Sequence, residues 1–581
     1  MSAAGVLDAP APPESAAAPA DAPAQRDIPA ALRSTLPTDT ARGRWVTAAV
    51  VAVAALTRLW DVSFPPGKIF DEAYYATEAQ EMLRYGYEDN RGYMFIVHPP
   101  LGKWLIGLGS WLFGDNSLGW RIIPAVAGIL CVLLLTRITR RITGSTLLGG
   151  IAGLLLAIEG MSVVLSRTAL LDIFLPLFLL GAFGAFVLDR DQLRGRLATL
   201  LADGADLSGG CPALGPRPWR LIGGACLGLS LAVKWSAASF VVAFILLDLW
   251  WDRGALKAAG VRRPALGALR RSVPYALGSL VIAPLGVYLA TWTGWFVGES
   301  GWNRYWAAQG GQGIGFRAWW APSFLVDHLP GPLRSLINYH YNAYQFHVTL
   351  HSAHAYGSSP WSWLVLGRPV SLYYVGDQTG CGAATCAREV VLLGTPLMWW
   401  AFVPATLWCL WHWATTRDWR AEVVLVAFVA GWAVWLREPK RTMFLFYMAP
   451  LVPFLILGVT LAIGVALRTD IGRPLRRYAI PDPIRAAPVP DAVFPDLPDL
   501  PDAVFPELGD ARPGALPAGA VPTDGAPTGA VVADGADPGG AEPGGSGASA
   551  GGGAGEPAPA PGRPGAPTPG RAADSPSLLV L

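Results

Sequence analysis

Two adjacent carboxylates, Asp71 and Glu72, follow directly after the first long apolar segment of the chain. That segment, about residues 43–62, is long enough to cross a bilayer, so the pair is expected near a membrane surface. Ionised groups at this depth are costly unless they are paired or hydrated, and they often mark functional sites. A carboxylate placed there could take a proton from a hydroxyl nucleophile. From position alone, a solvated loop with an aromatic anchor is an equal alternative.

Basic residues on the same side could neutralise a phosphate. Several lie near the outer ends of expected spans, where simple topology disfavours them. Arginine can bind a phosphate through two parallel hydrogen bonds, and lysine supplies a point charge. With the carboxylates, they predict a site at headgroup depth where a phosphate ester bond breaks. The alternative is that each reaches the interface individually. They are Arg58, Arg121, Arg167, Lys234, Arg437, Lys440 and Arg441.

A later segment is rich in histidine and aromatic residues. His340, His347 and His354 recur every seven residues, a spacing that would place them on one face of a helix. One interpretation is a metal site. The favoured one is an acceptor or donor groove that includes Tyr339 and Trp361, because the chain has no HExxH motif and the cluster has no acidic ligand. The tryptophans could stack on sugar rings or anchor at the interface.

His98 is a further candidate for the groove. It precedes Pro99 and Pro100, which stop the preceding structure and can begin the helix that follows. An orienting or capping role is therefore the simpler interpretation of His98.

Composition places the chain in a membrane. Its 581 residues are 52% hydrophobic and only 15% charged, and they include 25 tryptophans. Repeated apolar runs of about 18 residues indicate spanning helices. The net charge of +2 gives no support for a nucleic-acid partner. We expect an all-α polytopic membrane protein with ten spans, at about residues 43–62, 118–137, 145–163, 168–188, 219–234, 236–251, 272–292, 392–414, 420–437 and 442–466.

The positive-inside rule orients these spans. With the N-terminus inside, the basic stretch 137–141 and the basic loop 252–271 become cytoplasmic. Two large loops then face outward, at about 61–117 and 293–391. The apolar stretch 101–113 in the first loop is short and interrupted by glycine, so we expect an interfacial helix there. An eleventh span is the alternative.

The ends of the chain differ from its centre. Residues 1–42 are rich in Ala and Pro and lack a cleavable apolar core, so a disordered cytoplasmic tail is expected and no signal peptide. Residues 478–581 are expected to form a second disordered tail. The catalytic domain is expected within 43–470. Cys381 and Cys386 lie close together in an external loop, where a disulfide is expected.

The order of several motifs along the chain is distinctive. They are Arg58 with Phe70-Asp71-Glu72, His98-Pro99-Pro100-Leu101-Gly102-Lys103, Trp120-Arg121-Ile122-Ile123-Pro124-Ala125, Ser166-Arg167-Thr168-Ala169-Leu170-Leu171-Asp172, Gly228-Leu229-Ser230-Leu231-Ala232-Val233-Lys234-Trp235, the His/Ser-Pro-Trp loop, and Arg441-Thr442-Met443-Phe444-Leu445-Phe446-Tyr447. Together they closely resemble the protein O-mannosyltransferase family in its actinobacterial form. The resemblance covers about 43–470 and leaves out both tails.

The resemblance implies a glycosyltransferase fold of the GT-C type, with ten or eleven membrane helices and interfacial helices in the first external loop. It implies transfer of mannose from polyprenyl-phosphate-mannose to Ser or Thr hydroxyls of secreted proteins, with inversion, at the extracytoplasmic face of the cell membrane. Its partners would be that donor, the secreted acceptors and membrane lipid, with the secretion translocon as a further candidate. The external loop 293–391 is too short for the sugar-binding-like insert of eukaryotic members.

The resemblance also assigns roles. Asp71 would be the general base, and Glu72 its supporting neighbour, tied to Arg58. One basic carboxylate and a cationic pocket suffice for a single inverting displacement, so no cofactor is expected and a metal is not required. The candidates for the donor phosphate are Arg58, Arg121, Lys234 and Arg441.

Two other functions were weighed. A different polyprenyl-phosphate-sugar transferase, acting on lipid or polysaccharide, would share the external carboxylate, but the segments 340–363 and 441–447 argue against it. A transporter would show internal repeats and charges near mid-membrane. The sequence has no such repeat, and its charges gather at one face.

Overall fold

Each of the ten apolar segments expected to cross the membrane contains a helix, because a helix satisfies its own backbone hydrogen bonds where water is absent. The last segment, 442–466, becomes an α-helix only at Val452 and begins with an irregular stretch and a 3₁₀ turn. The computed structural model describes residues 28–33, 37, 39–87, 97–311, 326–437 and 440–467. The expected tail at 478–581 lies outside them. The helices at the ten positions are α1 (Thr40–Leu59), α4 (Ser117–Thr143), α5 (Thr146–Ala157) with α6 (Gly160–Ser166), α7 (Phe174–Ala202), α8 (Pro218–Val233), α9 (Ala238–Ala258), α11 (Val273–Ala276) with α12 (Ala283–Thr291), α17 (Pro396–Thr416), α18 (Trp419–Trp432) and α19 (Val452–Ala466).

Fewer than ten of these meet a strict criterion of length and hydropathy. Within the described part of the chain, five helical segments are long and apolar enough to cross a membrane, or six if α5 and α6, bent by 62°, count as one span. α8 and α19 are apolar but have only 16 and 15 residues. α1 carries arginine near both ends, and α17 is rich in tryptophan, so both are less apolar. The fold is a multi-span helical membrane protein by either measure.

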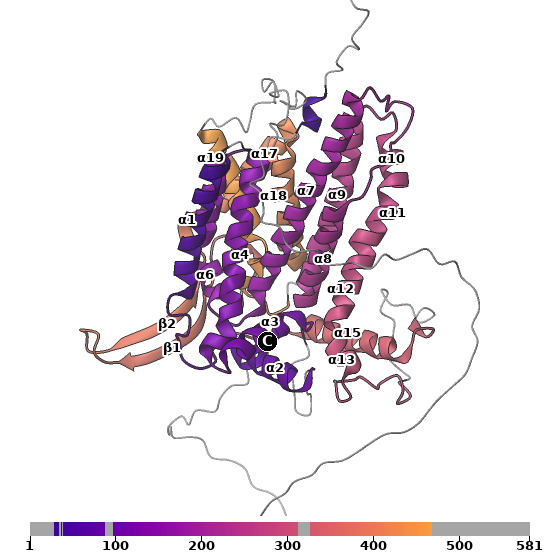
Figure 1. Ribbon diagram of the computed structural model, residues 1–581. Helices are drawn as coiled ribbons and strands as arrows, with labels where there is room; N and C mark the ends of the chain where they lie inside the picture. Colours follow the sequence, from indigo (N-terminus) through magenta and orange to yellow (C-terminus); the bar gives the residue numbers. More distant parts are fainter. Residues whose placement is uncertain are drawn as a thin grey trace, which may run out of the picture. The chain divides into compact units, whose positions relative to one another are not determined.

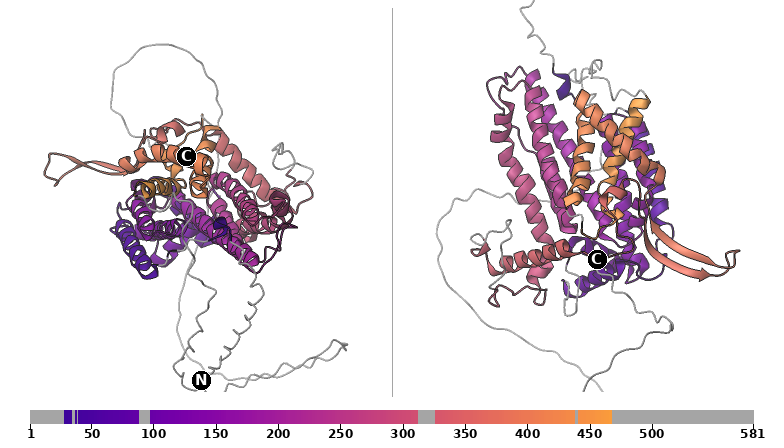
Figure 2. Two further views of the ribbon diagram at one scale, coloured as in Figure 1. Left: turned by 90° about the horizontal axis from the view of Figure 1, so that it is seen from above. Right: turned by 180° about the vertical axis from the view of Figure 1, so that it is seen from behind.

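The long helices lie side by side, and shorter helices gather at one end of them (Figures 1 and 2). This end contains α2 (Glu72–Tyr85), α3 (Leu101–Phe113), α13 (Thr293–Val297) and α15 (Gly331–Thr349). α3 packs on α2 and α4 there and does not run the length of the long helices, which agrees with an interfacial helix.

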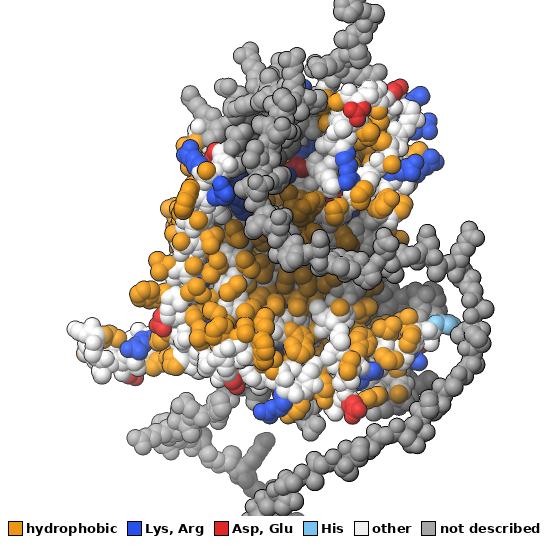
Figure 3. Space-filling model, in the orientation of Figure 1, with side chains coloured by type: hydrophobic (Ala, Val, Ile, Leu, Met, Phe, Trp, Pro, Cys, Tyr) orange, Lys and Arg blue, Asp and Glu red, His pale blue; other side chains and the backbone are white. Residues whose placement is uncertain are grey.

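The surface carries a band of hydrophobic side chains across the long helices. Figure 3 shows this band, with Lys and Arg gathered near the end where α10 (Pro264–Arg271) lies. The end with α2, α3 and α15 is the opposite one. An apolar band with a basic side is the pattern that the positive-inside rule describes.

One β-hairpin departs from the all-α expectation. β1 (Val370–Gln378) and β2 (Cys386–Leu392) pair antiparallel, with Val370 opposite Leu392. The hairpin projects sideways from the end that holds α2 and α3 (Figure 1). Cys381 and Cys386 form a disulfide at its turn, which confirms the expected pairing.

The segment 1–42, expected to be disordered, contains structure near its end. A short helix, Ala30–Leu32, precedes α1, and α1 itself begins at Thr40. Leu32 is buried against α7 and α9 residues, including Leu193 and Leu256. Its apolar contact explains why this stretch differs from the expectation.

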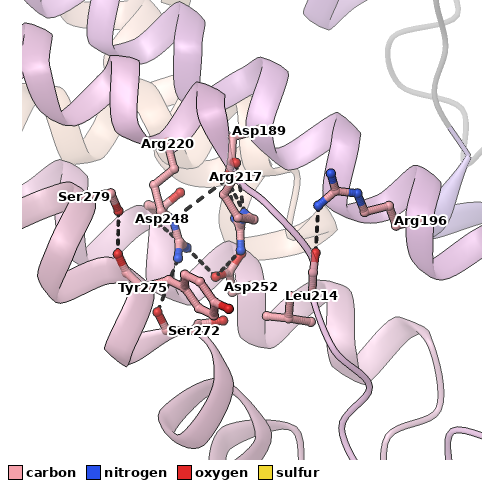
Figure 4. A network of polar contacts seen from close by, with 10 residues as sticks. All are labelled: Asp189, Arg196, Leu214, Arg217, Arg220, Asp248, Asp252, Ser272, Tyr275 and Ser279. Atoms are coloured by element: carbon pink, nitrogen blue, oxygen red, sulfur yellow. Dashed lines mark hydrogen bonds and ion pairs between the residues drawn. The ribbon is translucent and has the colours of Figure 1, made fainter. Parts of the chain in front are cut away.

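Near the basic end, buried charges join α7, α8 and α9 (Figure 4). Arg217 donates to Asp189 (Nε–Oδ1 2.9 Å) and to Asp252 (Nη1–Oδ2 3.0 Å). Arg220 pairs with Asp248 at 2.5 Å and also with Asp252. Each charge therefore has an opposite partner on a neighbouring helix, as buried charges require.

Close packing of α8 gives a test of the fold. A Cβ at Gly224 would lie 1.7 Å from the carbonyl oxygen of Ser279, so Gly224→Ala must push α8 away from the π-helical turn at Leu277–Ile282. We expect a loss of about 1 to 3 kcal/mol, measured as a lower unfolding temperature in detergent. Gly286→Ala is the matched control, because nothing lies within 4 Å of its Cβ position. Equal unfolding temperatures of the two variants would contradict this packing.

Candidate active site

Asp71 is held as an unpaired carboxylate at the start of α2. Phe70, just before it, adopts a left-handed backbone conformation with φ 47°, which turns the chain into the helix. The Asp71 carbonyl accepts from the Tyr74 and Tyr75 amides, both at 3.0 Å. Its carboxylate makes no hydrogen bond to a described residue, although the side chain is only 7% exposed. Its lone pairs are therefore not used by the described residues.

The Glu72 carboxylate is fully hydrogen-bonded within the protein. Its carboxylate accepts from Arg121 twice (Nε 2.7 Å and Nη2 2.6 Å), from the Ile69 amide at 3.0 Å and from the Ala169 amide at 2.7 Å. Neither Glu72 nor Arg121 is exposed to solvent. The adjacent carboxylates thus differ in their hydrogen bonding: among the described residues Asp71 has no hydrogen-bond partner for its carboxylate, and the Glu72 carboxylate accepts four hydrogen bonds.

Arg121 supports the Asp71 loop. Besides Glu72, it donates to the carbonyl oxygens of Ser63 (3.2 Å), Pro65 (2.7 Å) and Gly67 (3.0 Å). These contacts use all five N–H groups of the guanidinium. Arg121 has no donor left for a phosphate, so the structure places it in support of the loop and not in phosphate binding.

Arg58 also differs from its expected place. It donates to the carbonyl oxygens of Ala157 (2.9 Å) and Leu156 (3.1 Å) and to Ser166 Oγ (3.3 Å), and it is fully buried. The expected tie to Glu72 is wrong, because Glu72 pairs with Arg121 instead. Arg58 caps the C-terminal end of α5, where helix carbonyls lack partners.

Lys234 contacts a carboxylate from another helix and is close enough for its charge to act on Asp71. It follows the last residue of α8, and its ammonium pairs with Asp172 at 2.7 Å. Asp172 lies in the 3₁₀ turn Leu171–Ile173 that leads into α7. Burial raises the pKa of the Asp71 carboxyl to about 7; Lys234 opposes the rise and Asp172 adds to it. A base with such a pKa changes charge near neutral pH.

Arg441 reaches the same region through His347. His347 Nε2 lies 2.8 Å from the Val97 carbonyl and must donate to it, so Nδ1 is free to accept from Arg441 Nη2 at 3.2 Å. Arg441 Nε also donates to the His347 carbonyl at 2.9 Å. Burial lowers the pKa of His347 to about 4, helped by Arg441, so the ring stays neutral at pH 7. His98 packs beside it, with ring centroids 5.4 Å apart.

The groove histidines divide along α15. His340 stacks on Trp235 at 5.2 Å, and His347 contacts the same ring at 6.2 Å, so these two share a face as predicted. His340 Nδ1 donates to the Leu336 carbonyl, and its Nε2 accepts from the Tyr288 hydroxyl at 2.6 Å. This chain of contacts joins the histidines to the residue that follows Lys234.

Tyr339 packs in an aromatic cluster beside them. It is 4% exposed and contacts Trp292 at 4.9 Å and Trp302 at 5.2 Å. It lines a small cavity of about 20 Å³ together with Tyr87, Trp104 and Trp295. A cavity of this size holds about one water molecule, so the cluster is a packed aromatic contact between α3, α15 and the segment after α12.

His354 and Trp361 do not join this group. α15 ends at Thr349, so the predicted helical face does not extend to His354, whose Nδ1 accepts from the Tyr356 amide at 3.0 Å. Trp361 is 65% exposed and packs on Trp432. No group of three or more potential metal ligands occurs among the residues that the structure describes.

Asp172 is the residue at this site that the sequence reasoning did not single out. It was part of a recognised motif, but nothing in its spacing links it to Asp71, which lies about a hundred positions earlier. The usable signal was its charge: a single acidic residue at the edge of an apolar span is costly and calls for a partner. That partner is Lys234.

Comparisons with known proteins bear on this arrangement. Two family models, both described as dolichyl-phosphate-mannose-protein mannosyltransferase, match residues 97–204 and 48–120. Two similar curated proteins are described as polyprenol-phosphate-mannose–protein mannosyltransferase. One from Mycolicibacterium smegmatis is 43% identical over 453 residues, 76% of this chain and 86% of the relative. One from Mycobacterium tuberculosis is 41% identical over 477 residues, 78% of this chain and 88% of the relative.

A solved structure has the same fold. The S. cerevisiae protein O-mannosyltransferase complex bound to the sugar donor superposes with a TM-score of 0.57 and 16% identity, covering 77% of this chain and 90% of that one. At this identity the likeness concerns the fold alone. It agrees with the multi-span helical architecture that the sequence predicts.

The Glu72–Arg121 pair gives a test of the site's support. Glu72→Gln leaves the Arg121 guanidinium buried without its counter-charge, and we expect a loss of about 3 to 5 kcal/mol. The readout is the unfolding temperature of the purified protein in detergent. Glu299→Gln is the control, because Glu299 is an exposed carboxylate of the second external loop. If both variants unfold at the wild-type temperature, the pair does not hold the loop.

Proposed function

This chain belongs to the polyprenol-phosphate-mannose–protein mannosyltransferase family, and we propose that Asp71 is the general base of its transfer reaction. The main observation behind this proposal is that the Asp71 carboxylate is buried, makes no hydrogen bond to a described residue and feels the charge of the Lys234 ammonium. Its pKa of about 7 suits a group that must accept a proton near neutral pH. Glu72 is unsuited to this role, since Arg121 and two backbone amides occupy it.

The reaction is a single displacement. Asp71 accepts the proton of a Ser or Thr hydroxyl as its oxygen attacks the anomeric carbon of mannose from the face opposite the phosphate. The bond between that carbon and the phosphate oxygen breaks, and the electron pair leaves with the polyprenyl phosphate. The sugar is thereby inverted. A phosphate leaving group needs cationic stabilisation and no acid, so one carboxylate is sufficient.

Lys234 and Arg441 supply the positive charge for that leaving group. Lys234 uses one of its three N–H groups on Asp172, which leaves two for phosphate oxygens. Arg441 keeps unused N–H groups on Nη1 and Nη2 beyond its contacts with His347 and Tyr447. Burial lowers the pKa of His98, and the charges of Lys234 and Arg441 lower it further, so the ring is neutral at pH 7. We propose that these two cations bind the donor phosphate.

The site belongs on the extracytoplasmic face of the cell membrane. It lies at the end of the long helices opposite the gathered Lys and Arg side chains (Figure 3). The positive-inside rule assigns that basic end to the cytoplasm. Secreted proteins with accessible Ser and Thr residues are then the acceptors that can reach the site.

The role of Asp71 is tested by Asp71→Asn. We expect transfer from labelled polyprenyl-phosphate-mannose to a Ser/Thr-rich peptide to fall by about 100-fold or more, because the amide cannot accept the proton. In the wild-type enzyme, kcat/KM should rise with pH and reach half its plateau near pH 7, since the base acts only when deprotonated. Asp61→Asn, a change to an exposed acid of the same loop, is the control. Wild-type transfer by Asp71→Asn would remove Asp71 as the base.

The neutral His347 gives a paired test of the phosphate pocket. Asn at this position can keep an oxygen acceptor near the place of Nδ1 for Arg441, whereas Gln extends its amide toward the Val97 carbonyl. We expect His347→Asn to keep a KM for the donor within about threefold of wild type and His347→Gln to raise it about tenfold, as the loss of a charge-assisted hydrogen bond would. Donor KM is measured at constant peptide. A smaller effect for Gln than for Asn would contradict this orientation of Arg441.

A further inference from the structure

A buried carboxylate next to the base has no part in the displacement itself. Asp172 is 4% exposed, and Lys234 is the one hydrogen-bond partner of its carboxylate among the described residues. It stands at the entry to α7, whereas Lys234 stands at the exit of α8. Two separate helices thus place the Asp172 carboxylate and the Lys234 ammonium in contact, and both charges act on Asp71.

We propose that Asp172 is a positioning residue of the transfer reaction, which holds the Lys234 ammonium away from Asp71 and competes with the donor phosphate for it. This inference rests on the proposed roles of Asp71 and Lys234. Asp172 itself touches neither the sugar nor the acceptor.

The geometry explains why such a residue is needed. A lysine side chain is flexible, and a lone ammonium beside a buried carboxylate would pair with it directly. Asp71 would then be neutralised and weakened as a base. The 2.7 Å contact with Asp172 gives Lys234 another partner, and Asp71 keeps its lone pairs free.

When the donor binds, the charges at the site favour movement of the Lys234 ammonium from Asp172 to the donor phosphate. Asp71 and Asp172 together carry one more negative charge than Lys234 can balance. The charge of Asp71 acts on Tyr74 and Tyr75 of α2, Tyr75 also feels Glu78 and Tyr447, and Lys234 acts on His98 together with Lys103 and Arg441. A phosphodiester draws Lys234 toward itself and away from both carboxylates. Asp71 then loses a stabilising cation but keeps the repulsion from Asp172. Its affinity for a proton rises while the acceptor hydroxyl must lose one.

The test is the pH profile of Asp172→Asn. Removing the Asp172 charge should shift the acid limb of kcat/KM to lower pH by about one unit, because Asp71 loses a like-charge neighbour. The value of kcat at pH 7 should fall, because Lys234 can then pair with Asp71 and Asp71 is a weaker base. Asp172→Glu retains the charge and should keep the acid limb at its wild-type position.

Other outcomes separate this inference from the proposed function. A wild-type limb near pH 7 that Asp172→Asn does not move overturns the role of Asp172 alone. The absence of that limb in the wild type overturns the role of Asp71, and the inference with it. Asp172→Ser is a second neutral variant and must shift the limb in the same direction. If neither neutral variant folds while Asp172→Glu does, Asp172 serves stability and the inference is wrong.

Discussion

The buried ion pair between Glu72 and Arg121 is the interaction on which the site depends. It joins the start of α2 to α4, and its two partners also bind five backbone groups around the loop between α1 and α2 and the turn before α7. Such a pair costs desolvation energy, and complete hydrogen bonding compensates for it. Because Glu72 is fixed on every side, the neighbouring Asp71 can remain unpaired at a defined position. Glu72 thus fixes the loop, and the Asp71 carboxylate is left without a hydrogen bond to any described residue.

The basic residues on the outer side serve two different purposes. Arg58, Arg121 and Arg167 donate mainly to backbone carbonyls at the ends of α5 and α1 and in the loop that follows, where lipid would leave those carbonyls without partners. Lys234 instead pairs with Asp172, and Arg441 contacts His347, and the charges of both act on His98. Planar arginines with five donors suit the first task.

Sequence reasoning was strongest where one segment decides the outcome. Hydropathy located the ten helical positions. The seven-residue spacing was right for His340 and His347, which α15 contains, and failed at His354, which lies beyond its end. The partners of Arg58 and Glu72 could not be predicted, because they depend on how α1, α4 and α5 pack. The hairpin was missed because its strands are largely exposed and lack a sustained alternation of apolar residues.

The buried charges shared by α7, α8 and α9 bear on how the protein enters the membrane. Alone in lipid, α8 would carry two guanidinium groups near one end, and α7 and α9 would carry the carboxylates that match them. Charges that enter the membrane unpaired on a lone helix are costly. Release of the three helices from the insertion machinery as one preassembled group avoids this cost. Biogenesis, as well as stability, thus constrains which residues these helices can carry.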